Sequence, residues 1–427
     1  MSYEKKIRLN DGDLFNSILH KEKGHNGKDV LNGFHSKNIK DIICFAHLRW
    51  NFVFQRPQHL LSRWANEARV FYIEEPLRGN FESNYLKTIY SSNGEKLTVI
   101  TPYLKDNMTE SEVNQFMEES VNHIIRWYQV KDYMLWYLTP MAVEFSFHLN
   151  PKMIVYDCMD ELSCFKGAHP NMLGNENILL SRADVVFTGG HNLYEFKKNR
   201  HPNIHPFPSS IDQRHFESGA GCKDPVDQAS IPHPRIGFFG VLDERFDIEL
   251  LDKLAVLRPD LQFIMIGPVV KIDQSQLPRH ENIHYLGQKS YKDLPAYLAH
   301  WDIAILPFAK NESTRFISPT KTPEYLAAGK PVVSTSIRDV VVPYGEMGLV
   351  EIADDAQSFS DALTFLLQRK DTSQWALKVK DYLKGISWDL TFSDMRSVIY
   401  NTLAKKEEEE EVAMVGDGQG FISAHGE

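Results

Sequence analysis

Short apolar runs alternate with amphipathic segments along most of this chain, from about residue 40 to about residue 400. The runs are rich in Val, Ile, Phe and Tyr, which is typical of buried strands, and the segments between them have helical spacing. This alternation predicts an α/β fold, with parallel sheets covered by helices. The predicted strands are Asp41–Ala46, Arg69–Ile73, Leu97–Thr101, Tyr133–Tyr137, Met153–Asp157 and Asp184–Thr188, and then Arg235–Gly240, Leu261–Ile266, Ile283–Leu286, Ile303–Pro307 and Pro331–Ser334.

A change in composition divides the strands into two sets. The segment Asn199–Pro234 is rich in Pro, His, Ser and Gly, as is typical of a linker. A chain of 427 residues is also too long for one ordinary core, so we predict two tandem doubly wound domains. The predicted parts are a flexible arm (1–38), an N-terminal domain (39–207), a C-terminal domain (208–384), a helix that crosses back (385–405) and a disordered acidic tail (406–427).

The last predicted helix, around Ser387–Lys405, carries an apolar stripe. Such a stripe suits a helix that packs back on the first domain, and it also suits a coiled coil or a partner-binding helix. The stripe consists of Phe392, Met395, Ile399 and Leu403.

Composition narrows the classes of function. A formal net charge of −10 provides no overall basic field for nucleic acid. Four cysteines without a C-x-x-C pair are too few for a disulfide scaffold, and neither a signal peptide nor a membrane-spanning run is evident. We therefore expect a cytoplasmic protein. The basic segment 197–200 is either a solvated helix end or a weak contact with anionic lipid at the inner face of the cell membrane.

The segment Ser318–Val333 reads as loop, helix, turn and strand. We expect Thr322 to be the N-cap, Pro323 the first helical residue and Gly329 the left-handed terminator. An ordinary capped helix of an α/β protein would have the same features, so capping alone does not indicate a site.

Charged residues at the start of this helix indicate an anion site. Lys321 and Arg315 lie in or near the loop, and the free N–H groups of a helix start favour phosphate. Glu324 can accept hydrogen bonds from sugar or ribose hydroxyls. Further candidate contacts from the same segment are Ser318, Thr320, Thr322 and Tyr325.

Glycines follow three strands of the second set. In doubly wound folds, ligands bind beyond the carboxyl ends of strands, and Gly240, Gly267 and Gly287 would let a ligand approach the backbone there. One such glycine is usually an ordinary turn, but three at equivalent strand ends, taken together with the segment 318–333, favour a nucleotide-sugar site. No G-x-G-x-x-G or G-x-x-x-x-G-K-[ST] motif occurs, which argues against nicotinamide enzymes and NTPases. Neighbouring candidates are Arg245, Gln288 and Leu294.

The 318–333 segment resembles the E-Y-L-A-A-G-K-P-V-V signature of group 1 glycosyltransferases, and the resemblance extends over most of residues 40–400. It is similar in particular to the branch that includes teichuronic acid biosynthesis glycosyltransferases, which shares Q-R-P-Q and S-P-x-K-x-x-E-Y. The resemblance implies a GT-B fold, with two tandem Rossmann-like doubly wound domains and a cleft between them. It also implies that Glu324 binds the donor nucleotide sugar.

Two positions depart from the family pattern. Phe316 stands where the family usually has an acidic residue, eight positions before the glutamate. The loop after the first strand of the second domain usually carries both Arg and Lys, whereas here Arg245 is the one base among acids. Donor diphosphate contacts would then come from Lys321, Arg315 and Arg245.

A second group of polar residues follows the first strand of the chain. An aromatic ring beside His, Arg and Gln suits stacking on a sugar while its hydroxyls are hydrogen-bonded. The alternatives are that Trp50 is core and that Arg56 caps a helix or pairs with an Asp. Asp157 and Asp160 follow another strand, and Asp157 is equally suited to a structural hydrogen bond. The candidate acceptor contacts are Arg49, Trp50, Gln55, Arg56 and His59.

The resemblance implies transfer of a hexosyl group from a nucleoside diphosphate sugar to a glycan or lipid-linked acceptor in surface polysaccharide synthesis. The family retains anomeric configuration, and we predict no metal and no other cofactor, because prolines interrupt the lone His201-x-x-x-His205 spacing. Lys321 would stabilise the leaving diphosphate, and His47 or Asp160 would assist the acceptor. Two other hypotheses remain: a nucleotide-sugar epimerase of GT-B fold, and a catalytically weak sugar-nucleotide-binding subunit of a glycan-assembly complex.

Overall fold

The structure is a computed structural model that describes residues 3–7, 39–90, 96–369 and 372–418. The chain divides into two compact units. The first unit comprises Met1–Asp157, Asn171–Val186 and Asp394–Glu427, and the second comprises Cys158–Pro170 and Phe187–Ser393. Most of the predicted arm and the last nine residues lie outside the described residues.

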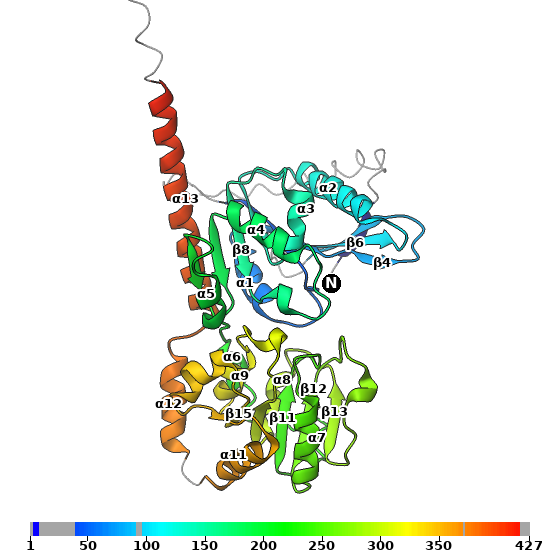
Figure 1. Ribbon diagram of the computed structural model, residues 1–427, viewed down its shortest axis with the longest axis vertical. Helices are drawn as coiled ribbons and strands as arrows, with labels where there is room; N and C mark the ends of the chain where they lie inside the picture. The colour runs from blue at the N-terminus through cyan, green and yellow to red at the C-terminus, as the bar shows by residue number, and fades with distance from the viewer. Residues whose placement is uncertain (1–2, 8–38, 91–95, 370–371, 419–427) are drawn as a thin grey trace, which may run out of the picture. The chain divides into compact units, whose positions relative to one another are not determined.

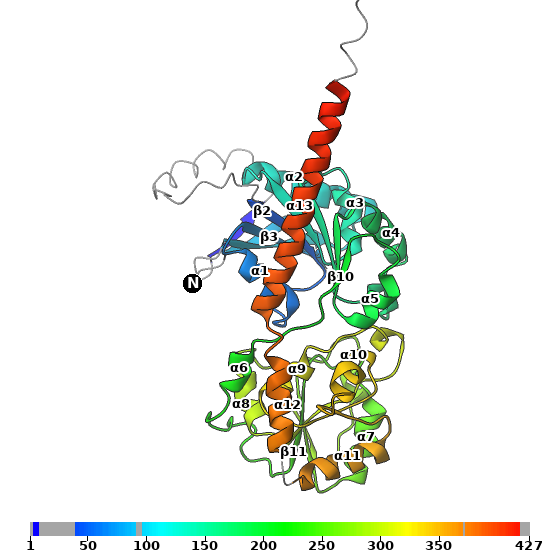
Figure 2. The same ribbon diagram turned by 90° about the vertical axis from the view of Figure 1, so that its left-hand side faces the viewer.

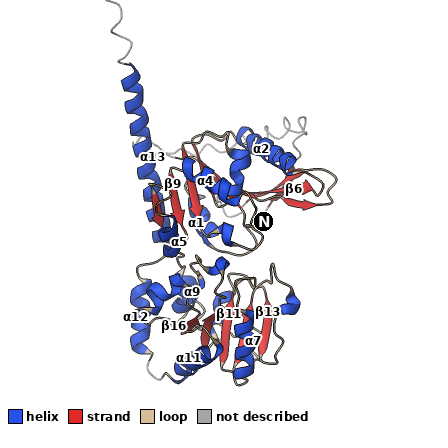
Figure 3. Ribbon diagram, in the orientation of Figure 1, coloured by secondary structure: helices blue, strands red, loops and turns tan. Residues whose placement is uncertain are grey.

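The first sheet has a parallel centre built from the predicted strands. Its order is β1-β5-β6-β3-β2-β7-β8-β9-β10, with β4 paired to β6 (Figures 1 and 3). The strands β2, β3, β7 and β8 pair in parallel register and are almost wholly buried, as expected of apolar runs covered on both faces. The strands of the alternating set are β2 (Asp41–Ala46), β3 (Arg69–Glu74), β6 (Leu97–Lys105), β7 (Tyr133–Tyr137), β8 (Met153–Cys158) and β9 (Val185–Thr188).

Several strands of this sheet were not predicted. β5 (Tyr85–Tyr90) and β1 (Tyr3–Ile7) extend it in antiparallel register, and β1 lies within the predicted flexible arm. β5 mixes buried and half-buried positions, so its pattern is weaker than that of the central strands. The remaining short strands are β4 (Leu77–Gly79) and β10 (Ile204–Pro206).

The helices between these strands follow the expected order. α1 follows β2 and α2 follows β6, as expected of the amphipathic segments between the predicted strands. The helices of this part are α1 (Arg56–Trp64), α2 (Glu110–Trp127), α3 (Val143–Ser146), α4 (Met172–Arg182) and α5 (His191–Lys197), with short 3-10 turns η1 (Pro140–Ala142) and η2 (Leu162–Cys164).

The last helix, α13 (Trp388–Gly418), is longer than predicted. Its predicted stripe buries Met395, Ile399 and Leu403. Helix continues past residue 406, where a disordered tail was predicted, because Glu and Lys are good helix formers and Lys406 binds Asp184 at 2.9 Å. The helix divides between the units at Ser393.

The second sheet is wholly parallel, with the order β13-β12-β11-β14-β15-β16. Helices α7 and α11 pack on one face, and α6, α8, α9 and α12 pack on the other (Figure 2). All five predicted strands of this set are present, and β16 is additional. The strands are β11 (Arg235–Phe239), β12 (Gln262–Ile266), β13 (Ile283–Gly287), β14 (Ile303–Leu306), β15 (Val332–Ser334) and β16 (Glu351–Ile352).

The first helix of the second sheet, α6, lies within the predicted linker. The helices of this sheet are α6 (Gln213–Glu217), α7 (Ile248–Leu257), α8 (Leu294–Ala299), α9 (Lys321–Ala327), α10 (Arg338–Val340), α11 (Ala356–Gln368) and α12 (Ser373–Leu383), with 3-10 turns η3 (Gln274–Gln276) and η4 (Glu312–Thr314) and the π-turn η5 (Val341–Gly345).

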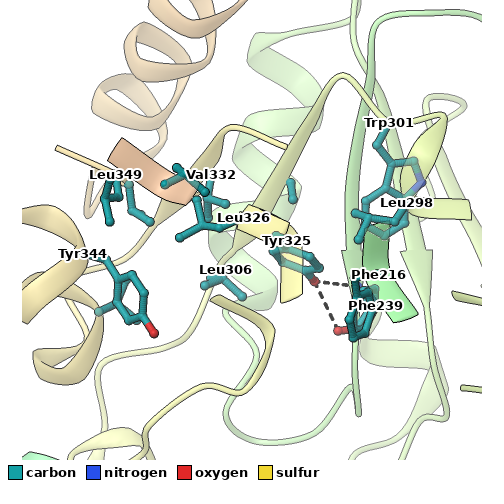
Figure 4. Close-up of a cluster of buried hydrophobic side chains, with 14 of the residues drawn as sticks. Phe216, Phe239, Leu298, Trp301, Leu306, Tyr325, Leu326, Val332, Tyr344 and Leu349 are labelled. Atoms are coloured by element: carbon teal, nitrogen blue, oxygen red, sulfur yellow. Dashed lines mark hydrogen bonds between the residues drawn. The ribbon is translucent and has the colours of Figure 1, made fainter. Parts of the chain in front are cut away.

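Tyr325 connects α9 to the centre of this sheet. Its side chain is fully buried, and its hydroxyl accepts a hydrogen bond from the Phe239 amide (2.9 Å) and donates to the Phe239 carbonyl (3.3 Å), as Figure 4 shows. The ring also packs edge-on against Phe239 at 4.9 Å. These contacts fix the start of α9 relative to the end of β11.

Candidate functional site

The three predicted glycines lie side by side at the carboxyl ends of β11, β12 and β13. The Gly240 amide donates to the Ile266 carbonyl (2.8 Å), and the Gly267 amide donates to the Gly287 carbonyl (2.9 Å). A methyl group at Gly267 would lie 1.7 Å from the Gly240 carbonyl oxygen, and the φ of Gly267 is +146°. The backbone approaches itself so closely here that no side chain fits.

Lys321, the first residue of α9, extends over Gly240. A methyl group built at Gly240 would lie 2.3 Å from Lys321 Cε and 3.2 Å from its Nζ. Within the described residues the ammonium makes no hydrogen bond or ion pair at the distances that define them. The strand ends therefore carry a cation whose donors remain available to a ligand.

Glu324 lies one helical turn after Lys321 and is only 7% exposed. Burial raises the pKa of Glu324 to about 8, although the charge of Lys321 acts in the opposite direction. Burial also lowers the pKa of Lys321, against the attraction of Glu324. An anion near Lys321 would favour its charged form, because opposite charges stabilise each other most where water is excluded.

Arg245 supplies a second cation from the loop after β11. Its Nε and one terminal nitrogen bind the Asp243 carboxylate at 2.6 to 3.1 Å, which fixes one edge of the guanidinium. The other terminal nitrogen makes no hydrogen bond to the described part of the chain. Asp160 acts electrostatically on both Arg245 and Lys321. The open edge of the Arg245 guanidinium can thus donate hydrogen bonds to an anion, as arginine does to phosphate oxygens.

Comparison with known proteins identifies the part of the chain that carries this cluster. Residues 233–369 match the family described as "Glycosyl transferases group 1". This part of the chain is similar to the group 1 glycosyltransferases. The chain is 25% identical over 223 residues to TuaH of Bacillus subtilis strain 168, named as a teichuronic acid biosynthesis glycosyltransferase. That match covers 48% of this chain and 55% of TuaH, so the chain spans about half the length of this relative.

Solved structures show that the chain has the GT-B fold. Sucrose-phosphate synthase from Thermosynechococcus elongatus matches with a TM-score of 0.64 and 13% identity, over 86% of this chain and all of the other. A UDP-forming trehalose-phosphate synthase from Burkholderia xenovorans matches at 0.62 and 11% identity, over 86% and 99%. Anabaena Alr3699/HepE, solved in complex with UDP, matches at 0.58 and 14% identity, over 85% and 100%.

The structure corrects two predictions about α9. Tyr325 is fully buried with its hydroxyl bound to Phe239, so it cannot contact a donor. Thr322 is not the N-cap: Thr320 precedes the helix, because the turn closed by the Thr322 amide on the Pro319 carbonyl starts it two residues earlier. Gly329 does end the helix, with φ +71°.

The other predicted donor contacts differ in their surroundings. Arg315 is mostly exposed and lies over the Phe316 ring at 5.0 Å, with Glu312 at 3.6 Å. The Ser318 carbonyl accepts from Ser209 Oγ at 3.1 Å, which fixes the loop before α9. Thr320 and Leu294 are half-buried, and Gln288 is exposed after Gly287.

Among the predicted acceptor contacts, Arg56 is instead part of a buried ion pair. Its guanidinium is 2% exposed and binds Asp157, itself fully buried, at 2.7 to 3.1 Å. This is the structural alternative considered for both residues. His59 is also mostly covered, at 5% exposure, with its ring against Phe54.

Arg49 and Trp50 are organised by Glu74, a buried carboxylate that was not predicted. Glu74 accepts from Arg49 Nη1 (3.1 Å), the Trp50 amide (2.8 Å) and Thr101 Oγ1 (2.7 Å). The Trp50 ring packs edge-on against Tyr72 and is half-buried. His47 is half-buried on the same loop, and Gln55 is half-buried at the N-cap of α1.

The predicted basic patch at 197–200 is not a continuous surface. Lys197 is fully buried and forms an ion pair with Glu161 at 2.5 Å, and Lys198 pairs with Glu195. Sequence reasoning had no signal for this, because the partner of Lys197 lies in a separate loop. A contact with lipid would therefore lack the charge of Lys197.

The described residues also bear on metal binding and on insertion into a membrane. No group of three or more His, Cys, Asp or Glu side chains in the described segments is arranged to hold a metal ion. No helix of the described chain is both long enough and apolar enough to cross a bilayer.

Proposed function

We propose that this protein transfers a hexosyl group from a nucleoside diphosphate sugar to a glycan or lipid-linked acceptor. The observation that carries the proposal is the pairing of Lys321 and Arg245 donors beside the glycine-lined ends of β11, β12 and β13. TuaH is named for teichuronic acid biosynthesis, which supports a surface polysaccharide as product. HepE was solved in complex with UDP, which supports a nucleotide sugar as donor.

The proposed reaction breaks the bond between the anomeric carbon and the diphosphate oxygen. The electron pair leaves with the diphosphate, while an acceptor hydroxyl forms the new bond on the same face, so that configuration is retained. The acceptor proton passes to the departing phosphate oxygen. Lys321 and the open edge of Arg245 stabilise the negative charge that develops, without need of a metal ion.

Glu324 has a different role in the proposed reaction. Its carboxyl group is buried beside Lys321, and no hydrogen bond within the described residues fixes its oxygens, so it is suited to bind donor hydroxyls. A pKa of about 8 means that Glu324 can hold a proton near neutral pH and donate as well as accept. Asp160, whose charge reaches Lys321, would assist the acceptor or limit the positive charge of the cluster.

For the acceptor we propose the loop that carries Arg49 and Trp50 in the first unit. Glu74 holds the arginine and the tryptophan backbone, which leaves the half-buried indole ring to stack on a sugar. Phe52 and Phe54 on the same loop are 36% and 40% exposed, which suits an acceptor with an apolar part such as a lipid carrier.

The test is a screen of purified protein for thermal stabilisation by UDP-, GDP-, ADP- and dTDP-sugars, followed by transfer assays with and without chelator. A ligand that binds the native state raises its melting temperature. The proposal expects stabilisation by one class of donor, chelator-resistant transfer, and loss of transfer with Lys321→Ala. Conversion of donor without acceptor would instead indicate an epimerase, and binding without any turnover would indicate a binding subunit.

A further inference from the structure

The loop after β8 contributes an aromatic ring to the cation cluster of the second unit. Residues 158–170 belong to that unit, although the strand before them belongs to the first. The half-buried Phe165 ring lies under two cations: its centroid is 5.5 Å from the Arg245 guanidinium carbon and 5.3 Å from Lys271 Nζ. Cations in this position are attracted to the electron-rich ring face.

The Phe165 ring and Asp243 constrain Arg245 in different directions. Asp243 holds the edge formed by Nε and one terminal nitrogen, and the ring lies against the guanidinium group itself. A planar guanidinium group that is held at one edge by a carboxylate and also lies against an aromatic ring has little rotational freedom left. The orientation of the other terminal nitrogen of Arg245 is therefore fixed.

Lys271 protects this arrangement from a competing carboxylate. Both Glu244 oxygens are buried without a hydrogen-bond partner in the described chain, and Glu244 acts electrostatically on the adjacent Arg245. Lys271 Nζ lies 3.5 Å from Glu244 Oε1 and so offsets its charge. Arg245 therefore remains with Asp243, while Lys271 contacts both the second carboxylate and the ring.

The loop itself is anchored immediately before Phe165. Glu161 forms the buried ion pair with Lys197 and accepts from Ser163 Oγ at 2.5 Å. The Cys164 carbonyl accepts from Ser313 Oγ at 3.0 Å, which connects it to the segment leading to α9. A ring carried on such an anchored loop can serve as a fixed support.

We propose that Phe165 is a positioning residue, which holds the guanidinium of Arg245 so that its open edge binds a phosphate of the donor. This inference rests on the proposed function, because it takes the ligand to be a nucleoside diphosphate. It assigns a donor-site role to a loop that the chain order places with the first domain. The contribution is specific to phosphate, since the ring acts on the donor through the guanidinium of Arg245.

The experiment measures affinities by calorimetry for UDP, GDP, ADP and dTDP, and for the monophosphate and nucleoside of whichever diphosphate binds. Phe165→Leu should weaken diphosphate binding by about fivefold, as expected for loss of a cation–ring contact, and leave nucleoside binding unchanged. Phe165→Tyr should restore binding, since it keeps the ring. Phe365→Leu, at an exposed phenylalanine of α11, is the matched control for the substitution itself.

A second comparison tests whether Phe165 acts through Arg245. In an Arg245→Met background, Phe165→Leu should have no further effect on diphosphate affinity. Equal losses for diphosphate and nucleoside, or a full further loss in that background, would overturn the positioning role while leaving the proposed function intact. If the wild-type protein binds none of the four diphosphates, the proposed function fails, and the inference fails with it. Melting temperatures of all variants establish that they are folded.

Discussion

Lys321 lies so close over Gly240 that a single methyl group at position 240 would come within 2.3 Å of Lys321 Cε. The two residues are 81 positions apart, since one ends β11 and the other starts α9. The location of the ammonium therefore depends on the absence of a side chain at the end of another strand.

Gly240→Ala should reduce donor binding much more than stability. The atom displaced is the far end of a flexible side chain, so the fold can adjust, although the φ of +157° adds some strain. The ammonium must move, and we expect diphosphate affinity to fall by about tenfold, as for a lost charge-assisted hydrogen bond. Calorimetric titration with UDP or the preferred diphosphate, together with thermal melts, separates the two effects. Unchanged affinity would show that Lys321 need not lie over residue 240.

Gly267→Ala is the opposite case. Here the added methyl would meet the Gly240 carbonyl oxygen at 1.7 Å, and backbone cannot move aside as a side chain can. We expect a loss of more than about 3 kcal/mol in unfolding free energy, or failure to fold. Urea unfolding would measure it, and a variant as stable as Gly240→Ala would contradict the close approach of β11 and β12.

Glu324 should make stability depend on pH. Burial raises its pKa to about 8, so the folded protein binds this proton more tightly than the unfolded chain, where the pKa is near 4.5. The associated stability is complete below about pH 4.5 and is lost as the pH rises through about 8. Glu324→Gln keeps the uncharged shape and should gain stability relative to wild type over that window.

Thermal melts of wild type and Glu324→Gln from pH 5 to about pH 8.5 test this linkage. Glu281→Gln, at an exposed carboxylate of the same unit, is the control for the loss of a carboxylate as such. If the Glu324→Gln difference from wild type is constant with pH, then the Glu324 carboxyl group ionises as it does in the unfolded chain.

Arg56 and Asp157 should behave as a buried ion pair. Arg56→Met leaves the fully buried Asp157 carboxylate without its partner, and we expect a loss of about 3–5 kcal/mol. Arg56→Met combined with Asp157→Leu removes both charges and should recover much of this loss. Denaturant titrations of the two single variants and the double variant measure the coupling; additive losses would argue against the pair.

Trp50→Ala should raise the KM for acceptor and leave the KM for donor nearly unchanged, because the proposed contact of the indole is with the acceptor sugar. Initial-rate kinetics with each substrate varied in turn would measure this. Tyr72→Phe, which keeps the ring packed on Trp50, is the control. An effect on donor KM alone would remove the acceptor assignment.

The parts of this protein that follow from local patterns could be predicted from its sequence. The parallel strands are apolar runs of the right length, and Gly329 ends its helix where a left-handed residue was expected. The adjacency of Gly240 and Gly267 follows because neighbouring parallel strands end at the same edge.

What could not be predicted depends on partners remote in the chain. Asp157 lies 101 positions after Arg56, and nothing near Arg56 in sequence distinguishes a buried guanidinium from one that binds a sugar. Asp339 likewise caps α5 by accepting from the His191 and Asn192 amides, 148 and 147 positions away. The inward orientation of Tyr325 also depends on Phe239, which lies 86 positions earlier and binds the tyrosine hydroxyl.

The division of the chain limits which fragments of this protein can contain a complete unit. The backbone passes from one unit to the other after Asp157, Pro170, Val186 and Ser393. A fragment that starts at residue 208 would lack the backbone amides that Asp339 caps and the carbonyl that Ser313 binds. Neither unit can therefore be obtained as a single continuous fragment of the chain. A chimera that exchanges donor specificity between relatives would have to include residues 158–170 and α5 as well as the later sequence.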